Sequence, residues 1–369
     1  MRSLLVAEQL RQRVPGGIGT YVRGLVQGLH RNGADVTLWA SRAAGGAPDS
    51  VAALGVPVVT SPLPSKALVW AWGRGRGAAP SGYDVVHASS LAVPPGGEAP
   101  LAVTVHDLAW RRVPETFPPR GRRWHEAALG RALDRAALVV APSRQTADDL
   151  LAAGAAAARV EVVDEGCDHL PPADLAGAAA FRAGVGVEGD YLLTVSTLEP
   201  RKNLPRLMAA YGAVRGRLPE PWPLLVVGPE GWGDALQPQG EVVLAGHVAD
   251  GGVLAGLYAG ARLVASVPLW EGFGLPAVEP MVVGTPVVAS PQPSLGGAAY
   301  EVDPLDVEAI GAALLRVATD GPLRDDLAAR GRARAAQLTW AATAARHAEL
   351  WDALAGASKR GLRGPNAQR

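Results

Sequence analysis

Two glutamates flank a glycine-rich turn in residues 269–281, which read LWEGFGLPAVEPM. An apolar strand over 262–267 precedes the turn, and a helix that starts in the turn leads to a buried strand over 287–289. Backbone N–H groups at such a helix start favour an anion, and glycine lets a ligand come close to the backbone. Glu271 and Glu279 would stand beside that anion site. The pattern suits a ligand with both a phosphate and free hydroxyl groups, as in a sugar nucleotide; a Rossmann-type helix with a solvated Glu279 is the alternative.

A basic pair stands where another strand gives way to a helix, in the run STLEPRKN over 196–203. Arg201 and Lys202 would lie at the helix N-terminus, where dipole, N–H donors and side-chain charge all favour a diphosphate. A solvated surface pair is the alternative, because most charged side chains are exposed.

Two further candidates follow strands in the first half. Gly17 lies in the turn PGGIGTY, which follows the first strand. A glycine turn at this place also occurs in dinucleotide-binding dehydrogenases, but this one lacks the full GxGxxG spacing. The sequence LWAS also stands where such a protein would carry an acidic residue, so the dehydrogenase alternative loses support. His106 ends the buried strand 101–106, at the carboxyl end where parallel sheets bind ligands. A structural histidine is the alternative; we favour a functional His106, with Asp107 in support.

Composition narrows the class of protein. A chain of 369 residues is too long for one ordinary core, so two domains are expected. Lys+Arg and Asp+Glu both number 35, so no global field steers the protein to nucleic acid. Cys167 is the only cysteine, which excludes an intramolecular disulfide and fits a reducing cytoplasm. The apolar run 3–7 is interrupted by Glu8, and no run nears the ~20 residues of a membrane span, so we expect a cytoplasmic protein.

Short apolar strands alternate with helical patterns twice, which predicts an α/β protein with two doubly wound parallel sheets. We expect domains at 1–170 and 171–340, joined by a linker within 164–189, a terminal helix at 341–357 that crosses back to the first domain, and a disordered tail at 358–369. The ligand cleft would lie between the domains. The expected strands are 3–7, 35–40, 56–60, 84–88, 101–106, 137–141, 160–163, 191–196, 224–228, 242–244, 262–267 and 287–289. The expected helices are 19–31, 122–135, 143–153, 204–218, 253–259, 275–283, 306–319, 323–337 and 340–355.

The pattern E-G-F-G-L-P-x-x-E-x-M-x-x-G-x-P-V-V-A-S over 271–290 resembles the E-x7-E signature of retaining glycosyltransferases of family 4, which have the GT-B fold of two Rossmann-like domains facing a central cleft. The resemblance covers nearly the whole chain. It implies that Lys202 contacts the donor diphosphate, and that Arg201 substitutes for an arginine that many relatives carry nearer the strand end. The chain departs from the family after Ser290, where PQPSLGGAA replaces a longer serine-rich turn and a PEVxGDAA stretch.

The same resemblance assigns the other site residues. Glu279 would hold the ribose hydroxyls, whereas Glu271 would hold the transferred sugar. In the first domain, Gly17 would approach the diphosphate and His106 the hydroxyls of the donor sugar. The remaining donor-binding positions are backbone sites at Gly228 and Val248 around the base, and at Phe273, Gly274 and Leu275 around the sugar and phosphate.

The function implied is transfer of a hexose from a nucleotide-diphosphate sugar, the co-substrate, to a glycan or lipid-linked acceptor. The runs TLEPRKN and VHDL are most similar to bacterial mannosyltransferases that use GDP-mannose in envelope or exopolysaccharide synthesis, with UDP-glucose and UDP-N-acetylglucosamine as alternative donors. The sequence has no D-x-D triplet, so we expect no essential metal and no further cofactor. A GT-B-fold epimerase and a non-catalytic sugar-nucleotide binder are the alternatives.

Basic residues accompany tryptophans in two places. Residues 70–76, WAWGRGR, are expected to form a loop. A second group surrounds a helix start and comprises Arg111, Arg112, Arg120, Arg122, Arg123 and Trp124. Such groups suit peripheral contact with an anionic membrane, here the inner membrane face, or a lipid-diphosphate acceptor. A solvated charged surface is the alternative.

Overall fold

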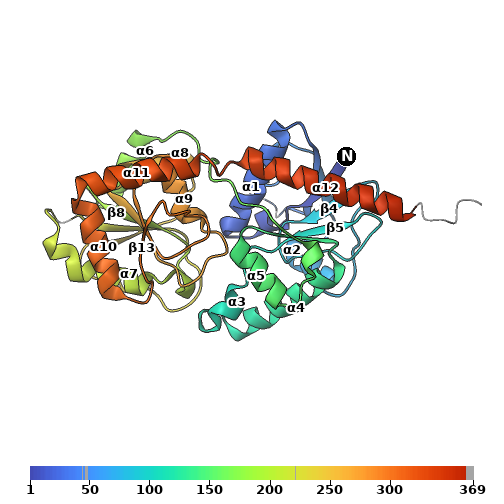
Figure 1. Cartoon of the computed structure of the whole chain (residues 1–369), viewed down its shortest axis with the longest axis horizontal. Helices are drawn as coiled ribbons and strands as arrows, with labels where there is room; N and C mark the ends of the chain where they lie inside the picture. Colours follow the sequence, from blue (N-terminus) through green and yellow to red (C-terminus); the bar gives the residue numbers. More distant parts are fainter. Residues whose placement is uncertain (44, 46–48, 221, 363–369) are drawn as a thin grey trace, which may run out of the picture. The chain divides into compact units, whose positions relative to one another are not determined.

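The computed structural model describes the chain except for residues 44, 46–48, 221 and 363–369. The chain forms two compact units (Figure 1). Unit 1 comprises Met1–Leu108, Pro118–Gly166 and Trp340–Arg369, and unit 2 comprises Ala109–Phe117 and Cys167–Thr339. No helix among the described residues is both long and apolar enough to span a membrane.

Unit 1 is built on a parallel seven-stranded sheet with the order β3-β2-β1-β4-β5-β6-β7. Its central strands are short apolar runs buried along their whole length, because helices cover both faces of the sheet. The strand order reverses between β1 and β4, which defines the switch point where such sheets bind ligands. The strands are β1 (Arg2–Val6), β2 (Asp35–Ser41), β3 (Val58–Ser61), β4 (Val85–Ala88), β5 (Leu101–Thr104), β6 (Leu138–Ala141) and β7 (Val160–Val162). The helices are α1 (Gly16–Arg31), α2 (Ser65–Gly73), α4 (Pro119–Arg135), α5 (Arg144–Ala152) and α12 (Trp340–Leu362).

The terminal helix α12 packs directly on α1, as the red and blue helices of Figure 1 show. Two glycines of α1 allow this close approach. A β-carbon at Gly24 would lie 2.1 Å from the indole of Trp340, and one at Gly28 would lie 2.2 Å from the Trp340 carbonyl oxygen. Because that oxygen is backbone, it cannot rotate away, so a side chain at Gly28 would displace α12 as a whole.

Unit 2 has a parallel six-stranded sheet with the order β10-β9-β8-β11-β12-β13. The order reverses between β8 and β11, so the loops after these two strands meet at the switch point. The strands are β8 (Leu192–Val195), β9 (Leu224–Val227), β10 (Val242–Gly246), β11 (Leu263–Ser266), β12 (Val287–Ala289) and β13 (Tyr300–Glu301). The helices are α3 (Ala109–Arg112), α6 (Leu175–Gly184), α7 (Leu204–Val214), α8 (Gly251–Gly260), α9 (Leu275–Val282), α10 (Val307–Thr319) and α11 (Gly321–Ala335).

The largest differences from the sequence-based expectations are in four segments. The expected loop at 70–76 begins within α2, and the expected linker contains α6, whose first turn is capped by Asp174 through the N–H of Gly177 at 2.8 Å. Residues 358–362 of the expected disordered tail continue α12, whereas 363–369 lie outside the described residues. Residues 109–117 group with unit 2 rather than with the first domain, since the Trp232 indole N–H donates to the Thr116 carbonyl at 2.9 Å.

Candidate functional site

The loops after β8 and β11 bring the basic pair to the glycine-rich turn. The loop after β8 forms a short 3-10 helix, Pro200–Lys202, and the loop after β11 carries Glu271. Asn203 joins the two loops because it adopts a left-handed conformation, φ 59°, and its amide donates to the Val267 carbonyl at 3.0 Å. Asparagine tolerates this region of backbone space better than most residues.

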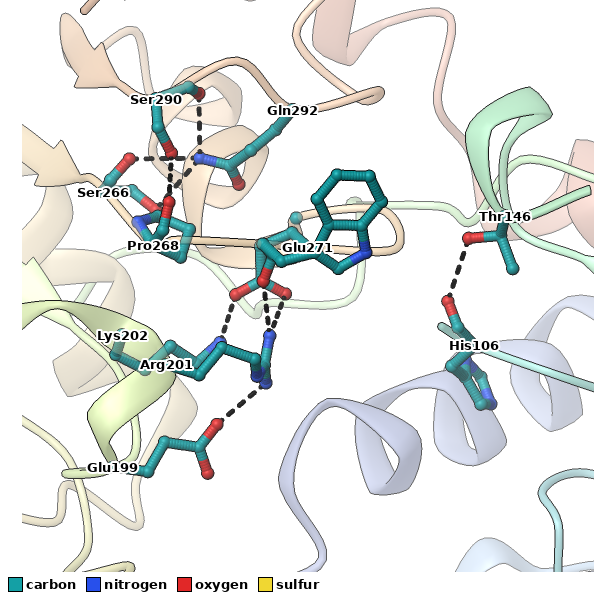
Figure 2. A network of polar contacts seen from close by, with 12 residues as sticks. His106, Thr146, Glu199, Arg201, Lys202, Ser266, Pro268, Glu271, Ser290 and Gln292 are labelled. Carbon is teal, nitrogen blue, oxygen red and sulfur yellow. Dashed lines mark hydrogen bonds and ion pairs between the residues drawn. The ribbon is translucent and has the colours of Figure 1, made fainter. Parts of the chain in front are cut away.

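A buried cluster of charges forms where these loops meet (Figure 2). The Glu271 carboxylate accepts a short hydrogen bond from the Lys202 ammonium and lies 3.0 Å from Nη1 of Arg201. The same Nη1 donates to the Trp270 carbonyl at 2.8 Å, and Nη2 lies 2.8 Å from the Glu199 carboxylate. The structure therefore brings together three residues that the sequence analysis singled out, Arg201, Lys202 and Glu271, and adds Glu199.

The two carboxylates of the cluster differ in acidity. Burial raises the pKa of Glu271, but the charges of Arg201 and Lys202 outweigh it and lower the pKa to about 2. At Glu199 burial is the stronger effect, so its pKa is raised in spite of the same cations. Glu271 is thus an anion at any physiological pH, and it holds both cations at the switch point of the sheet.

Glu279, on α9, is buried beside a tyrosine and a histidine. The Tyr258 hydroxyl donates to its Oε2 at 2.7 Å, and Nε2 of His169 lies 3.3 Å from its Oε1. Burial raises the pKa of Glu279, but the hydrogen bonds with His169 and Tyr258 lower it by more. A charged carboxylate has about four acceptor positions, so these two contacts leave capacity for the hydroxyl groups of a ligand.

Sequence reasoning missed His169 and Tyr258. His169 falls in the segment expected to be a linker, and Tyr258 lies within a helix without any recognisable motif. Nothing in the sequence around either residue indicates that they converge on Glu279.

The glycine-rich turn offers backbone rather than side chains. Phe273 and Leu275 bury their side chains in the core of unit 2. Gly274 between them caps α9 with φ 103°, a conformation that L side chains rarely adopt. The turn therefore presents its peptide groups, in keeping with the anion site expected from the sequence.

The two base-binding positions predicted in unit 2 have packing roles. Gly228 has φ 152°, and a β-carbon there would lie 1.8 Å from the Ser196 carbonyl oxygen, so the close approach of β8 and β9 by itself demands glycine. Val248 is nearly buried and packs in the cluster with Leu257 and Tyr258. These facts explain the residue types without a ligand, and the base-binding roles stay predictions.

In unit 1, both ring nitrogens of His106 contact the protein. Nε2 donates to the Ser89 carbonyl at 2.9 Å, and Nδ1 lies 3.0 Å from the Glu165 carboxylate. Burial lowers the pKa of His106, but Glu165 and the Ser89 carbonyl outweigh it, so the pKa is raised. We assign His106 as an imidazolium from these partners. The expected hydrogen bond from this ring to a donor hydroxyl would have to replace one of them.

Gly17 lies in the first turn of α1, which begins at Gly16 rather than at the expected residue 19. A β-carbon at Gly17 would meet no atom within 4 Å. Packing within unit 1 therefore gives no reason for a glycine here, and the close approach of a ligand stays a prediction.

A chain of buried hydrogen bonds lies behind His106 and links α12 to the sheet. It runs through Trp351, His87, Thr104, Tyr21, His347 and the Thr343 carbonyl, with distances of 3.0, 2.7, 2.9, 2.8 and 2.8 Å. The tryptophan N–H can only donate and the carbonyl can only accept, so one set of proton directions satisfies every link with both histidines neutral. Burial lowers the pKa of His87 and lowers that of His347 to about 4, which agrees with this assignment.

Two family models match the chain. The model described as Glycosyltransferase Family 4 matches residues 15–169, and the model described as Glycosyl transferases group 1 matches residues 189–320. Together they include every predicted site residue.

Curated relatives are similar over much of their length. The O-antigen chain mannosyltransferase B of Escherichia coli is 32% identical over 252 residues, which are 64% of this chain and just under two thirds, 66%, of that protein. The D-inositol 3-phosphate glycosyltransferase of Jonesia denitrificans is 30% identical over 380 residues, 89% of each protein.

Solved structures share the fold at low identity. The Anabaena protein Alr3699/HepE, in complex with UDP and glucose, has a TM-score of 0.70 at 19% identity and covers 96% of this chain and 100% of its own. Sucrose-phosphate synthase from Thermosynechococcus elongatus has a TM-score of 0.71 at 21% identity and covers 97% of this chain and 100% of its own. The two parallel-sheet α/β units are therefore those of the GT-B fold.

Proposed function

The chain belongs to glycosyltransferase family 4, and we propose that it is a retaining enzyme that transfers mannose from GDP-mannose to a glycan or lipid-linked acceptor. Glycosyl transfer is the activity named for the family and for both relatives. The donor sugar and the stereochemistry are the proposal. One observation carries the proposed binding of a diphosphate donor: Arg201, Lys202 and Glu271 converge at the switch point of the unit 2 sheet.

The chemical task is to stabilise a leaving diphosphate and an oxocarbenium-like transition state. The two cations would offset the charge that develops on the diphosphate, whereas the N–H groups of the glycine turn would bind the phosphate in the ground state and the transition state alike. We therefore propose that the donor departs without an essential metal or further cofactor. Glu279 would bind the ribose hydroxyls through the acceptor positions that His169 and Tyr258 leave open.

Retention is proposed to follow from attack on the same face as the departing diphosphate. A covalent route needs a carboxylate nucleophile at the reacting carbon. Glu271 is poorly suited to that role because Arg201 and Lys202 engage its carboxylate and hold its pKa at about 2. Proton NMR of the first-formed product tests this point: an α-linked product from GDP-mannose is expected, and a β-linked product would rule out retention.

Mannose is favoured by the Escherichia coli relative, which is named as a mannosyltransferase. UDP-glucose is the second candidate, because the Anabaena structure of the same fold holds UDP and glucose. A thermal-shift panel of GDP-, UDP- and ADP-sugars separates them, since a ligand at 100 times its Kd stabilises the folded state by about 2.7 kcal/mol. GDP-mannose is expected to give the largest shift. No shift with any sugar nucleotide would overturn the donor assignment.

Incubation with the donor, first alone and then together with acceptors, separates the two rival activities from a transferase. An epimerase would convert the sugar of the donor without any acceptor, whereas a non-catalytic binder would release no nucleotide diphosphate with any acceptor. A transferase is expected to release the nucleotide diphosphate in proportion to the glycoside formed.

We also propose peripheral contact of unit 1 with an anionic membrane through the start of α4. Arg120, Arg123 and Trp124 are exposed there, and the first turn of α4 has no acidic residue. Directly after α2, the Arg74 guanidinium lies 3.8 Å from the centre of the exposed ring of Trp70. Arg111 and Arg112 belong to unit 2 instead, so the basic group identified in the sequence is divided between the units.

Substitution of Arg120, Arg122 and Arg123 by alanine should weaken sedimentation with anionic liposomes. Arg144→Ala, at an exposed position on α5, should leave it unchanged. Equal liposome binding by the triple variant and by Arg144→Ala would reject the contact.

A further inference from the structure

Gln292 joins the ends of two strands behind the glycine turn. It follows β12 and is 7% exposed. Its amide nitrogen donates to the Ser266 carbonyl at 3.1 Å and lies 3.3 Å from the Ser290 carbonyl (Figure 2). Because β11 ends at Ser266 and β12 at Ala289, the amide ties together the two strand ends next to the turn.

The amide oxygen of Gln292 is buried and has no hydrogen-bond partner among the described residues. It faces the turn, since a β-carbon at Gly274 would lie 2.2 Å from it. The carbonyl groups around the other end of the amide identify that end as the nitrogen, so the orientation is fixed. A buried acceptor without a partner destabilises a protein by about 1–3 kcal/mol. The amide nitrogen thus ties the strand ends together, whereas the amide oxygen contributes no hydrogen bond that would stabilise the fold.

The same loop also engages the carbonyl groups of the turn. The Ser294 N–H donates to the Phe273 carbonyl at 3.2 Å, and the Ser294 hydroxyl donates to the Gly274 carbonyl at 3.3 Å. The turn is thus held through two of its carbonyl groups by Ser294, and the Gln292 amide oxygen lies close beside Gly274. None of these contacts uses the N–H groups of Phe273, Gly274 or Leu275.

We propose that Gln292 is a positioning residue for the donor, which fixes the glycine turn against the ends of β11 and β12 so that the N–H groups of the turn bind the sugar phosphate. This inference rests on the proposed function. It assigns to the loop after Ser290 the task of holding the donor-binding turn. Gln292 acts through the turn and need not contact the donor.

The test compares steady-state kinetics of two variants with wild type. Gln292→Met keeps the length of the side chain and removes both the hydrogen bonds and the unpaired oxygen. The Ser266 carbonyl stays paired with the Ser290 N–H at 3.0 Å, so the fold should tolerate the change. We expect KM for the donor to rise about tenfold with kcat nearly unchanged, because the turn binds ground state and transition state alike. The exposed Gln337→Met serves as the matched control and should leave KM unchanged.

Gln292→Glu keeps the shape and turns the donor end of the amide into an acceptor that faces two carbonyl groups. It should raise KM more than Gln292→Met does at pH 8, and KM should fall again as the pH is lowered and the introduced carboxyl group is protonated. A residue with only a packing role would not give this pH-dependent recovery. Should either variant fail to fold, Gln292→Asn, which keeps the amide, is expected to show an intermediate KM.

The outcomes separate this inference from the proposed function. If wild type itself binds no sugar nucleotide in the thermal-shift panel, the proposed function fails first. If wild type binds the donor and folded Gln292→Met has an unchanged KM, the positioning role is overturned while the function stands. An unchanged KM together with a lowered Tm would assign Gln292 to stability alone and would also overturn the inference.

Discussion

At the carboxyl ends of the two sheets, the buried polar groups differ in how far their hydrogen-bonding capacity is used. In unit 1, the hydrogen bonds behind His106 form a chain in which every donor and acceptor has one partner. In unit 2, two cations converge on one carboxylate, and the buried Ser196 hydroxyl and Gln292 oxygen have no partner among the described residues. The first arrangement is complete by itself, whereas the second has charge and hydrogen-bonding capacity for a ligand. Disruption should therefore reduce stability in unit 1 and activity in unit 2.

The largest effect should follow Lys202→Ala. Loss of a donor that stabilises developing negative charge slows an enzyme by about 10²–10³-fold in kcat. The free energy of unfolding should change little, because Glu271 keeps Arg201 as a partner. Initial rates at saturating donor measure the effect, and Lys359→Ala, an exposed residue on α12, is the control. A wild-type kcat would remove Lys202 from the site.

Glu279→Ala should act on binding instead. Hydrogen bonds to a charged group contribute about 1.5–3 kcal/mol, so we expect the Kd for the nucleotide to rise about 10- to 100-fold. Isothermal titration with the nucleotide diphosphate measures this change.

Glu271→Ala should impair sugar transfer more than nucleotide affinity. Equal effects of Glu271→Ala and Glu279→Ala on the Kd for the nucleotide diphosphate would contradict the division of roles.

Tyr21→Phe tests the closed network of unit 1. It leaves the Thr104 O–H without its acceptor and Nε2 of His347 without its donor in the buried core, which should lower the free energy of unfolding by about 1–3 kcal/mol. Urea denaturation provides the measurement, with the half-buried Tyr83→Phe of the same unit as control. Identical midpoints would show that the network does not stabilise the fold.

The smallest effect concerns pH. The pKa of His106 is raised in the folded state, so its contribution to stability is fully present below the unfolded pKa of about 6.5 and is lost as the pH rises through the folded pKa. Glu165→Gln removes the main cause of the rise. The stability difference between wild type and Glu165→Gln should therefore be largest near pH 6 and shrink toward pH 9. A difference that grows with pH would contradict the imidazolium assignment.

Local patterns predicted the parts of the site that lie within single loops. Arg201 and Lys202 follow a strand, and Glu271 lies beside a glycine turn, so parallel-sheet topology alone brings them to one edge. Tyr258, His169 and Gln292 could not be found in this way, because their contacts depend on how distant helices and loops pack.

Two helices, α2 and α6, were predicted wrongly because of features of their local sequence. Helix α2 has no side-chain cap, and an extended proline precedes it, so its apolar run looked like a loop. Helix α6 follows two prolines and is rich in alanine and glycine, which resembled a linker, although Asp174 at its start was a usable capping signal.

The path of the chain through unit 1 constrains the order of its folding during synthesis. The partners of Tyr21 and His87 in α12 are translated only after all of unit 2, because unit 1 contains residues 340–369 as well as the first two segments. Domains usually fold in the order in which they leave the ribosome. Here unit 2 can complete its core first. Until α12 is translated, Tyr21 and His87 of unit 1 lack their partners in that helix, and Gly24 and Gly28 of α1 stay uncovered. A nascent-chain proteolysis series should accordingly show protection of unit 2 before unit 1.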